Sequence, residues 1–111
     1  MIGQPGDSIA YINWISNPFR AEKFAAIWTP ASEAVLDYGA TGWALLRSGN
    51  DPQQFMQLAL FPNKLDFERY WLSPEIAEYR VQAQGLFQVP VLPEWYTVEG
   101  NGSVIGALLE S

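Results

Sequence analysis

The chain of 111 residues contains no cysteine and no histidine. Without cysteine it can form no disulfide, no thiolate nucleophile and no cysteine-ligated zinc or iron–sulfur centre. Without histidine it can build neither a histidine-based catalytic triad nor a histidine-ligated haem or iron site. Carboxylates could still bind hard cations, but the sequence has no Asp-rich calcium loop and no glycine-rich phosphate loop. We therefore expect a protein with no metal site and no cofactor.

Basic residues are scarce as well. Six Lys and Arg face twelve Asp and Glu, for a net charge of −6. A phosphate backbone or an anionic membrane surface needs a basic face, so the charge argues against both as partners. No run reaches the roughly 20 apolar residues of a membrane-spanning helix. Residues 1–7 lack the basic region and apolar core of a secretory signal, and we expect a cytoplasmic protein.

Aromatic residues, in contrast, are abundant: six Phe, five Trp and five Tyr. With 49% hydrophobic and 16% charged residues, the composition is typical of a globular chain. A chain of this length forms one domain around one core, which we place at residues 8–99, followed by a tail at 100–111. One small core does not hide all these rings, so some are expected in a pocket or a subunit interface.

Runs of β-branched and aromatic residues predict four strands, at 8–16, 41–48, 53–61 and 94–99. Asn17-Pro18 is a helix-start signature, and apolar residues then recur at spacings of three and four up to Tyr38. Pro30 should kink this helix or break it in two, and Gly39 suits its end. The tail from Ser103 to Ser111 is apolar enough that we expect it to pack on its own subunit or a partner.

A second helix is predicted from Asn63, a possible cap, to Gly85. Ser73-Pro74-Glu75 inside it is another helix-start signature, so this helix should bend or restart there. The order β-α-β-β-α-β is the ferredoxin-like arrangement. It predicts an α+β fold with a four-stranded antiparallel sheet and both helices on one face.

Alternation divides the strand residues into two sets, both apolar. We group Ala10, Ile12, Trp14, Ala44, Leu46, Met56, Leu58, Leu60, Tyr96 and Val98 in one set. The other set is Ile9, Tyr11, Asn13, Ile15, Trp43, Leu45, Arg47, Phe55, Gln57, Ala59, Phe61, Trp95 and Thr97. A sheet that is apolar on both faces must be covered on both, and the helices cover only one. A second subunit is the simplest cover for the other face, so we expect a homodimer; which set faces the helices stays open.

The stretch Phe67 to Arg80, F-E-R-Y-W-L-S-P-E-I-A-E-Y-R, supports a resemblance. It resembles the dimeric α/β-barrel superfamily, and within it the antibiotic-biosynthesis-monooxygenase-like domains, whose second helix often carries an aromatic-x-x-aromatic-x-x-Ser pattern. The resemblance covers about residues 8–99. It implies a dimeric barrel and a superfamily of cofactor-free quinone-forming oxygenases, haem-degrading enzymes and isomerases.

The haem-degrading members use an Asn of the first strand, a Trp of the second helix and a later His of that helix. Aligned on Phe67 and Ser73, the Trp position holds Tyr70 and the His position holds Arg80, while Asn13 could take the Asn role. Since the haem-ligating His is missing, the resemblance does not imply haem degradation here.

These considerations select Asn13, Tyr70 and Arg80 as candidate catalytic residues, and Trp71, Arg47 and Trp43 as candidate ligand-binding residues. Each has a structural alternative. Asn13 could bond backbone at an edge or interface, either Arg could pair with one of the many carboxylates, and the aromatic residues could belong to the core or to an interface.

The leading hypothesis is that an apolar or aromatic metabolite binds in a cleft between sheet and helices. The protein could then act as a cofactor-free oxygenase, because that chemistry needs only an apolar pocket and groups that stabilise a substrate anion. The alternative is a non-catalytic ligand-binding or protein-interaction module. An enzyme predicts that Asn13, Tyr70, Trp71 and Arg80 converge on one cavity.

Overall fold

The structure, a computed structural model, describes residues 5–101 of the chain. Its elements are β1 (Ser8–Ile15), α1 (Ala21–Glu33), the 3-10 helix η1 (Ala34–Tyr38), β2 (Gly42–Arg47), β3 (Gln54–Phe61), α2 (Lys64–Trp71), α3 (Pro74–Gln82) and β4 (Glu94–Thr97). The four strands lie where the β-branched and aromatic runs predict them. The expected packing of the tail from Ser103 to Ser111 lies outside the described residues.

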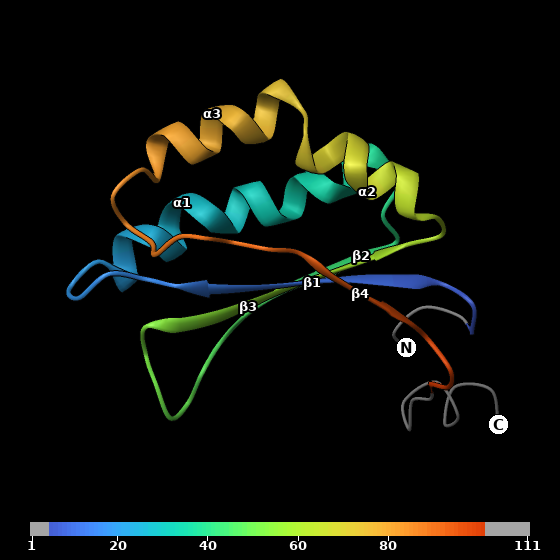
Figure 1. The fold of residues 1–111 in the computed structure, drawn as a ribbon, viewed down its shortest axis with the longest axis horizontal. Helices are drawn as coiled ribbons and strands as arrows, with labels where there is room; N and C mark the ends of the chain where they lie inside the picture. Colours follow the sequence, from blue (N-terminus) through green and yellow to red (C-terminus); the bar gives the residue numbers. More distant parts are fainter. Residues whose placement is uncertain (1–4, 102–111) are drawn as a thin grey trace, which may run out of the picture.

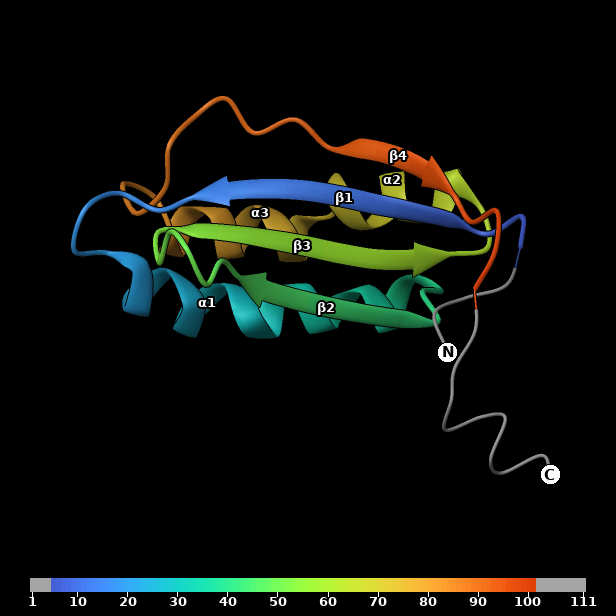
Figure 2. The same cartoon turned by 90° about the horizontal axis from the view of Figure 1, so that it is seen from below.

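The strands form one antiparallel sheet in the order β2-β3-β1-β4, which Figure 2 shows from below. Because β3 lies between β1 and β2, the unit β1-α1-β2 is a split βαβ. All the helices lie on one face of the sheet (Figure 1). The ferredoxin-like α+β fold predicted from the order of elements is therefore confirmed.

The strand register corrects the grouping of strand residues into two faces. Ala10 is paired with both Ala59 and Trp95, and Trp14 is paired with Phe55. The even-numbered residues of β1 therefore share a face with the odd-numbered residues of the other strands, not with the even-numbered ones. The residues that face the helices are Ala10, Ile12, Trp14, Trp43, Leu45, Phe55, Gln57, Ala59, Phe61 and Trp95. The grouping was wrong for β1 because alternation gives the period within a strand but not the phase between strands.

The first helix begins later than Asn17 and Pro18 predict. It starts at Ala21, and no side chain caps its first turn. Asn17 instead donates its side-chain amide to the carbonyl of Gly85 over 2.8 Å, which ties the loop after β1 to the end of α3. Phe19, between Asn17 and Ala21, has a positive φ of 65°, a conformation outside the right-handed helix. The predicted cap is therefore wrong.

Pro30 lies inside α1 without ending it. A helix survives the loss of one backbone hydrogen bond where tertiary packing holds it, and Phe24, Trp28 and Ala31 on both sides of the proline are all buried. The α-helix ends at Glu33, about one turn after Pro30, and the 3-10 helix η1 begins at Ala34. The break in the helix therefore lies after Pro30 rather than at it. Gly39, with a φ of 99°, ends η1 as predicted.

Asn63 and Ser73 start two separate helices, as their capping chemistry predicts. Asn63 Oδ1 accepts the backbone N–H of Asp66 over 3.0 Å. Ser73 Oγ accepts that of Ile76 over 3.2 Å, with proline in the first helical turn. The predicted restart at Ser73 is thus confirmed, and α2 and α3 form two segments that both cover the sheet (Figure 1).

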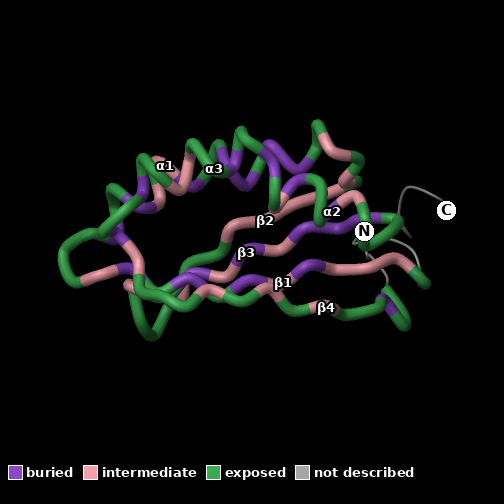
Figure 3. The backbone as a smooth tube through the Cα atoms, turned by 45° about the horizontal axis from the view of Figure 1, so that its top comes forward, coloured by how far each residue is buried: buried purple, intermediate pink, exposed green. Residues whose placement is uncertain are grey.

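The buried residues gather between the helices and the sheet (Figure 3). This core is dominated by aromatic rings: Trp14, Phe24, Trp28, Phe61 and Tyr70 are all at most 1% exposed. The space in which the sequence predicts a ligand cleft is therefore largely filled by side chains.

Among the described residues, none of the helices has the length and apolar character needed to cross a membrane.

Candidate functional site

A buried polar network lies between β1, β3, α1 and α2. Gln57 Oε1 accepts the indole N–H groups of Trp14 and Trp28, each over 2.9 Å. Gln57 Nε2 donates to the hydroxyl of Tyr70 over 3.0 Å, and that hydroxyl donates to the carbonyl of Ala31 over 2.7 Å. No buried side-chain nitrogen or oxygen in residues 5–101 lacks a partner. The network is closed in the sense that each of its buried side-chain nitrogen and oxygen atoms already has a hydrogen-bond partner.

This closed network determines the chemistry open to Tyr70. Burial raises the pKa of the Tyr70 hydroxyl far above its ordinary value, and the hydrogen bond from Gln57 opposes that effect only in part. Tyr70 is therefore protonated at neutral pH. Its side chain is 0% exposed, so it supports neighbouring groups rather than presenting a base to a ligand.

An aromatic surface leads outward from this network. The ring of Trp14 contacts Trp71 of α2 (centroids 6.1 Å apart) and Phe87 of the following connection (5.0 Å). Phe67 stacks on Trp71 at 5.8 Å and meets Trp95 of β4 edge-on at 4.4 Å. Trp71, Phe87 and Trp95 are half-buried, and they form what we call the aromatic rim. The rim gives a planar apolar molecule rings to pack on.

Arg80 of α3 lies against this rim. Its guanidinium carbon is 4.1 Å from the centre of the Trp71 ring, and its Nη2 donates to the Trp71 carbonyl over 3.0 Å. Burial lowers the pKa of Arg80, while the neighbouring Tyr70 raises it. The ion pairs found within residues 5–101 do not include Arg80. A half-buried cation with no carboxylate partner is suited to hold an anionic group.

Asn13 does not join these residues. It lies on the other face of the sheet, where it is exposed and its Oδ1 accepts the hydroxyl of Tyr11 over 3.2 Å. The predicted convergence of Asn13 with Tyr70, Trp71 and Arg80 on one cavity is therefore wrong. Trp14, the next residue along β1, occupies the helix-facing position instead.

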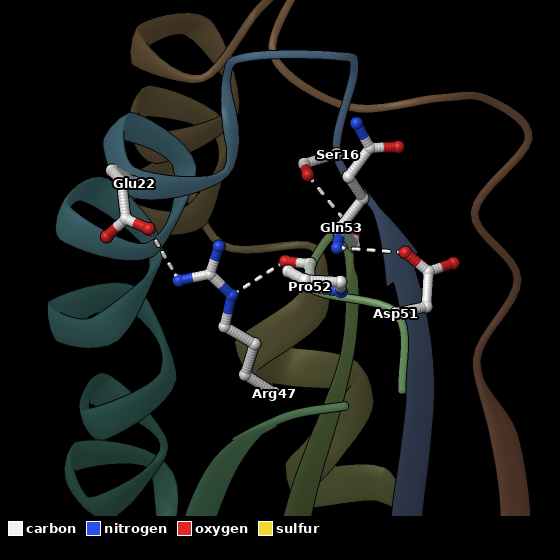
Figure 4. A network of polar contacts seen from close by, with 6 residues as sticks. All are labelled: Ser16, Glu22, Arg47, Asp51, Pro52 and Gln53. Carbon is white, nitrogen blue, oxygen red and sulfur yellow. Dashed lines mark hydrogen bonds and ion pairs between the residues drawn. The ribbon is translucent and has the colours of Figure 1, made fainter. Parts of the chain in front are cut away.

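Arg47 belongs to a different network, shown in Figure 4. Its guanidinium pairs with Glu22 of α1 at 2.6 Å and donates to the carbonyl of Pro52 at 2.6 Å. These contacts tie the β2–β3 hairpin to the start of α1, which is the structural alternative considered for Arg47. Trp43 is half-buried on the helix-facing side of β2 and packs on the core. The ligand-binding roles of both residues stay predictions.

Residues of the described range 5–101 line four cavities that we compare here. Their volumes are about 290 Å³ at the β2–β3 hairpin, 540 Å³ beside η1 and α2, 280 Å³ between α1 and α3, and 340 Å³ beside β1 and the connection before β4. Tyr70, Trp71 and Arg80 line none of the four. A ligand at the aromatic rim would therefore lie on its outer surface or displace one of its side chains.

Sequence reasoning missed Gln57 as the centre of the buried network. One signal was available, since Gln57 is a polar residue in an otherwise apolar run. Its partners lie far away along the chain, at Trp14, Trp28 and Tyr70, and only the strand register and helix packing bring them together.

No protein-family model matches the sequence, and no curated protein matches it. Solved structures do match. A candidate antibiotic biosynthesis monooxygenase from Nitrosomonas europaea superimposes with a TM-score of 0.76 at 14% identity, covering 88% of this chain and 95% of its own. A similar candidate from Bordetella bronchiseptica gives 0.73 at 20% identity, covering 84% and 97%. SnoaB, a cofactor-independent oxygenase from Streptomyces nogalater, gives 0.71 at 14% identity, covering 86% and 96%.

The fold is that of the antibiotic-biosynthesis-monooxygenase-like proteins. The match confirms the resemblance found in the stretch from Phe67 to Arg80. At 14–20% identity the monooxygenase-like proteins share a fold with this chain, and its chemistry has to be argued from its own residues.

Proposed function

We propose that the protein binds a planar aromatic molecule with an anionic oxygen at the aromatic rim, and that it promotes reaction of this molecule with O2 without a cofactor. The observation that carries the proposal is Arg80, a half-buried cation that lies on Trp71 and has no carboxylate partner among the described residues. Trp71 would stack on the ligand, and Arg80 would neutralise its charge. The likeness in fold to a cofactor-independent oxygenase is consistent with this chemistry.

The reaction would draw its electrons from the substrate. An activated ring CH2 group reacts with O2 to give a ring C=O and water, so two C–H bonds break and one oxygen atom forms a double bond to that ring carbon. The other oxygen atom leaves with both hydrogens. Stabilising the intermediate anion is the main task left to the protein, and the positive charge of Arg80 beside Trp71 would serve it.

The environment of Tyr70 restricts the choice of substrate. Its hydroxyl is protonated and bonded to Gln57 and Ala31, so it is no base at neutral pH. The substrate would have to be acidic enough to ionise beside Arg80 without a strong protein base. Tyr70 would position α2, and through it Trp71, rather than take part in proton transfer.

We also propose that the protein works as a homodimer in the cytoplasm, with sheet packed on sheet. The sheet face away from the helices, which we call the open face, carries Ile9, Tyr11, Asn13, Ile15, Ala44, Leu46, Met56, Leu58, Leu60 and Tyr96. Leu46 is 48% exposed and Ile15 is 42% exposed in the single chain. A second copy would remove these apolar side chains from water.

The non-catalytic alternative rests on two observations. Asn13 lies on the other sheet face from Tyr70, Trp71 and Arg80, so the convergence on one cavity that an enzyme predicts is not found. The network around Gln57 is closed, and the described part of the chain leaves no buried polar side-chain atom without a partner. Active sites often keep such atoms for the substrate. A protein that binds a ligand at the aromatic rim without turning it over would have this arrangement.

A hydroxylated anthrone tests both ideas, because it is planar and has an acidic CH2 between two aromatic rings. Binding is measured by quenching of tryptophan fluorescence, and turnover by O2 consumption. Arg80→Gln should weaken binding by about tenfold or more, as expected for the loss of a charge-assisted hydrogen bond. Arg69→Gln is the matched control, because Arg69 lies on α2 in an exposed ion pair with Asp66.

Saturable binding with O2 uptake that Arg80→Gln abolishes would support the oxygenase. Saturable binding that depends on Arg80 without O2 uptake would favour the non-catalytic alternative. If both Arg variants bind the probe as the unmodified protein does, the site at the aromatic rim is wrong.

A further inference from the structure

The connection before β4 leaves part of the β1 edge unpaired. Tyr11 of β1 lies opposite Glu94, the first residue of β4. Further along β1, the backbone N–H of Gln88 donates to the carbonyl of Ile15 over 2.8 Å. Between these two points the chain bows away from β1, as Figure 2 shows. The cavity of about 340 Å³ is lined there by Asn13, Ile15, Gln88, Val89, Pro90, Leu92 and Glu94.

The backbone of Asn13 points toward this cavity. The carbonyls of Asp7 and Ile15 both accept hydrogen bonds from the β4 side, at 2.9 and 2.8 Å. In an antiparallel sheet the backbone groups of every second residue point to the same neighbour, so those of Asn13 point to that side as well. No backbone hydrogen bond from the connection to Asn13 is found in residues 5–101. One N–H and one C=O of a strand edge are therefore presented to the cavity.

Two side chains add polar groups. Asn13 Oδ1 accepts the Tyr11 hydroxyl, which leaves its amide N–H2 to donate elsewhere. Glu94 Oε2 accepts the Tyr96 hydroxyl over 3.0 Å, and within the described chain its Oε1 has no protein partner. The cavity thus combines a carboxylate, an amide donor and a backbone donor–acceptor pair.

Apart from Gln88, the remaining walls are apolar. Val89 is 79% exposed, Leu92 is 73% exposed and Ile15 is 42% exposed, and all three line the cavity together with Pro90. These side chains gain from contact with an apolar group that leaves water. A ligand that satisfies the whole cavity therefore carries a cation, an amide and an apolar side chain close together.

We propose that this cavity binds an α-amino amide: a primary ammonium group beside an amide, with an aliphatic side chain. The ammonium group bonds Glu94, the amide continues the β-ladder on Asn13, and the side chain packs on Val89 and Leu92. The same chemistry occurs in a free amino-acid amide and at the N-terminus of a peptide. The cavity lies apart from Arg80 and the aromatic rim, so this proposal does not rest on the proposed chemistry. Because Asn13 and Ile15 also belong to the open face, it requires that the proposed homodimer leave this end of the face accessible.

L-Leucinamide is the probe, added to the full chain and followed by two-dimensional 1H–15N NMR. At about pH 6 its amine is protonated. We expect saturable shifts at Asn13 and in residues 88–94, and only small shifts at the aromatic rim. N-Acetyl-leucinamide keeps the amide and side chain but lacks the charge, and it should bind about tenfold or more weakly.

Glu94→Gln should weaken leucinamide binding to the same degree, while Glu78→Gln, on the exposed face of α3, should bind as the unmodified protein does. The spectrum of each variant without ligand shows whether it is folded. A Leu-Gly-Gly amide distinguishes the two sources. A site for peptide N-termini should bind it more tightly than leucinamide, whereas a site for a free amino-acid amide should not. The proposal is overturned if leucinamide gives no saturable shifts, or if the acetylated probe or Glu94→Gln binds equally well.

Discussion

Replacing Gln57 with leucine removes the centre of the buried network while keeping a side chain of similar size. The indole N–H groups of Trp14 and Trp28 lose their shared acceptor, Gln57 Oε1, and both rings are at most 1% exposed. Each buried donor left without a partner costs about 1–3 kcal/mol, so the two together cost roughly 4 kcal/mol of unfolding free energy. Tyr70 keeps its own bond to the Ala31 carbonyl, so its loss is smaller.

Urea denaturation followed by tryptophan fluorescence measures this loss, with the slope of the transition checked to be unchanged. Gln54→Leu is the matched control, because it places the same substitution on the same strand at an exposed position, where we expect a change within about 0.5 kcal/mol. A loss below about 1 kcal/mol for Gln57→Leu would refute the reasoning, since it would mean that water or other groups satisfy the two indoles.

Three further predictions concern the core, the hairpin and the open face. Burial raises the pKa of Tyr70, so the protonated hydroxyl stabilises the fold at pH values below the ordinary tyrosine pKa. This contribution to the free energy of unfolding is lost as the pH rises above about 10. Tyr70→Phe should reduce that alkaline loss of stability, as measured by urea denaturation at a series of pH values. Arg47→Gln should cost about 1 kcal/mol or less, because its ion pair with Glu22 is exposed, and it should leave probe binding at the aromatic rim unchanged in the fluorescence assay. Met56→Lys, on the open face, should convert the proposed homodimer to a monomer in analytical ultracentrifugation, and an unchanged dimer would place the interface elsewhere.

The sequence predicts the order of elements and most of their ends because those depend on local chemistry. Asn63 and Ser73 cap their helices through contacts three residues away, and Gly39 stops η1 through its own φ. Asn17 has the same capping chemistry, yet its side chain bonds Gly85, 68 residues away. Nothing in the local pattern distinguishes the two outcomes, since a distant carbonyl competes with the nearby helix N–H groups.

The candidate site was predicted only in part. Trp71 and Arg80 are only nine positions apart in the sequence, so their contact depends on the short turn between α2 and α3 and on no distant part of the chain. Asn13 was assigned to the same site from its polarity and from the resemblance, but its face depends on how β1 is phased against β3. A shift of one residue moves every side chain of a strand to the opposite face, and single-sequence alternation leaves that choice open.

The phase of β1 also explains why a tryptophan, and not a small polar residue, faces the helices from this strand. Asn13 and Trp14 are adjacent, so only one of them can face the helices, and Trp14 does. A buried indole needs an acceptor, which Gln57 supplies, and Gln57 in turn takes up the hydroxyl of Tyr70. The Trp14 ring fills space between the sheet and the helices. Its indole and the Tyr70 hydroxyl occupy the hydrogen-bonding groups of Gln57, which a small polar residue at that position would leave for a ligand. The two ligand sites that we propose therefore lie further out, at Arg80 and the aromatic rim on one face and at Asn13 on the other.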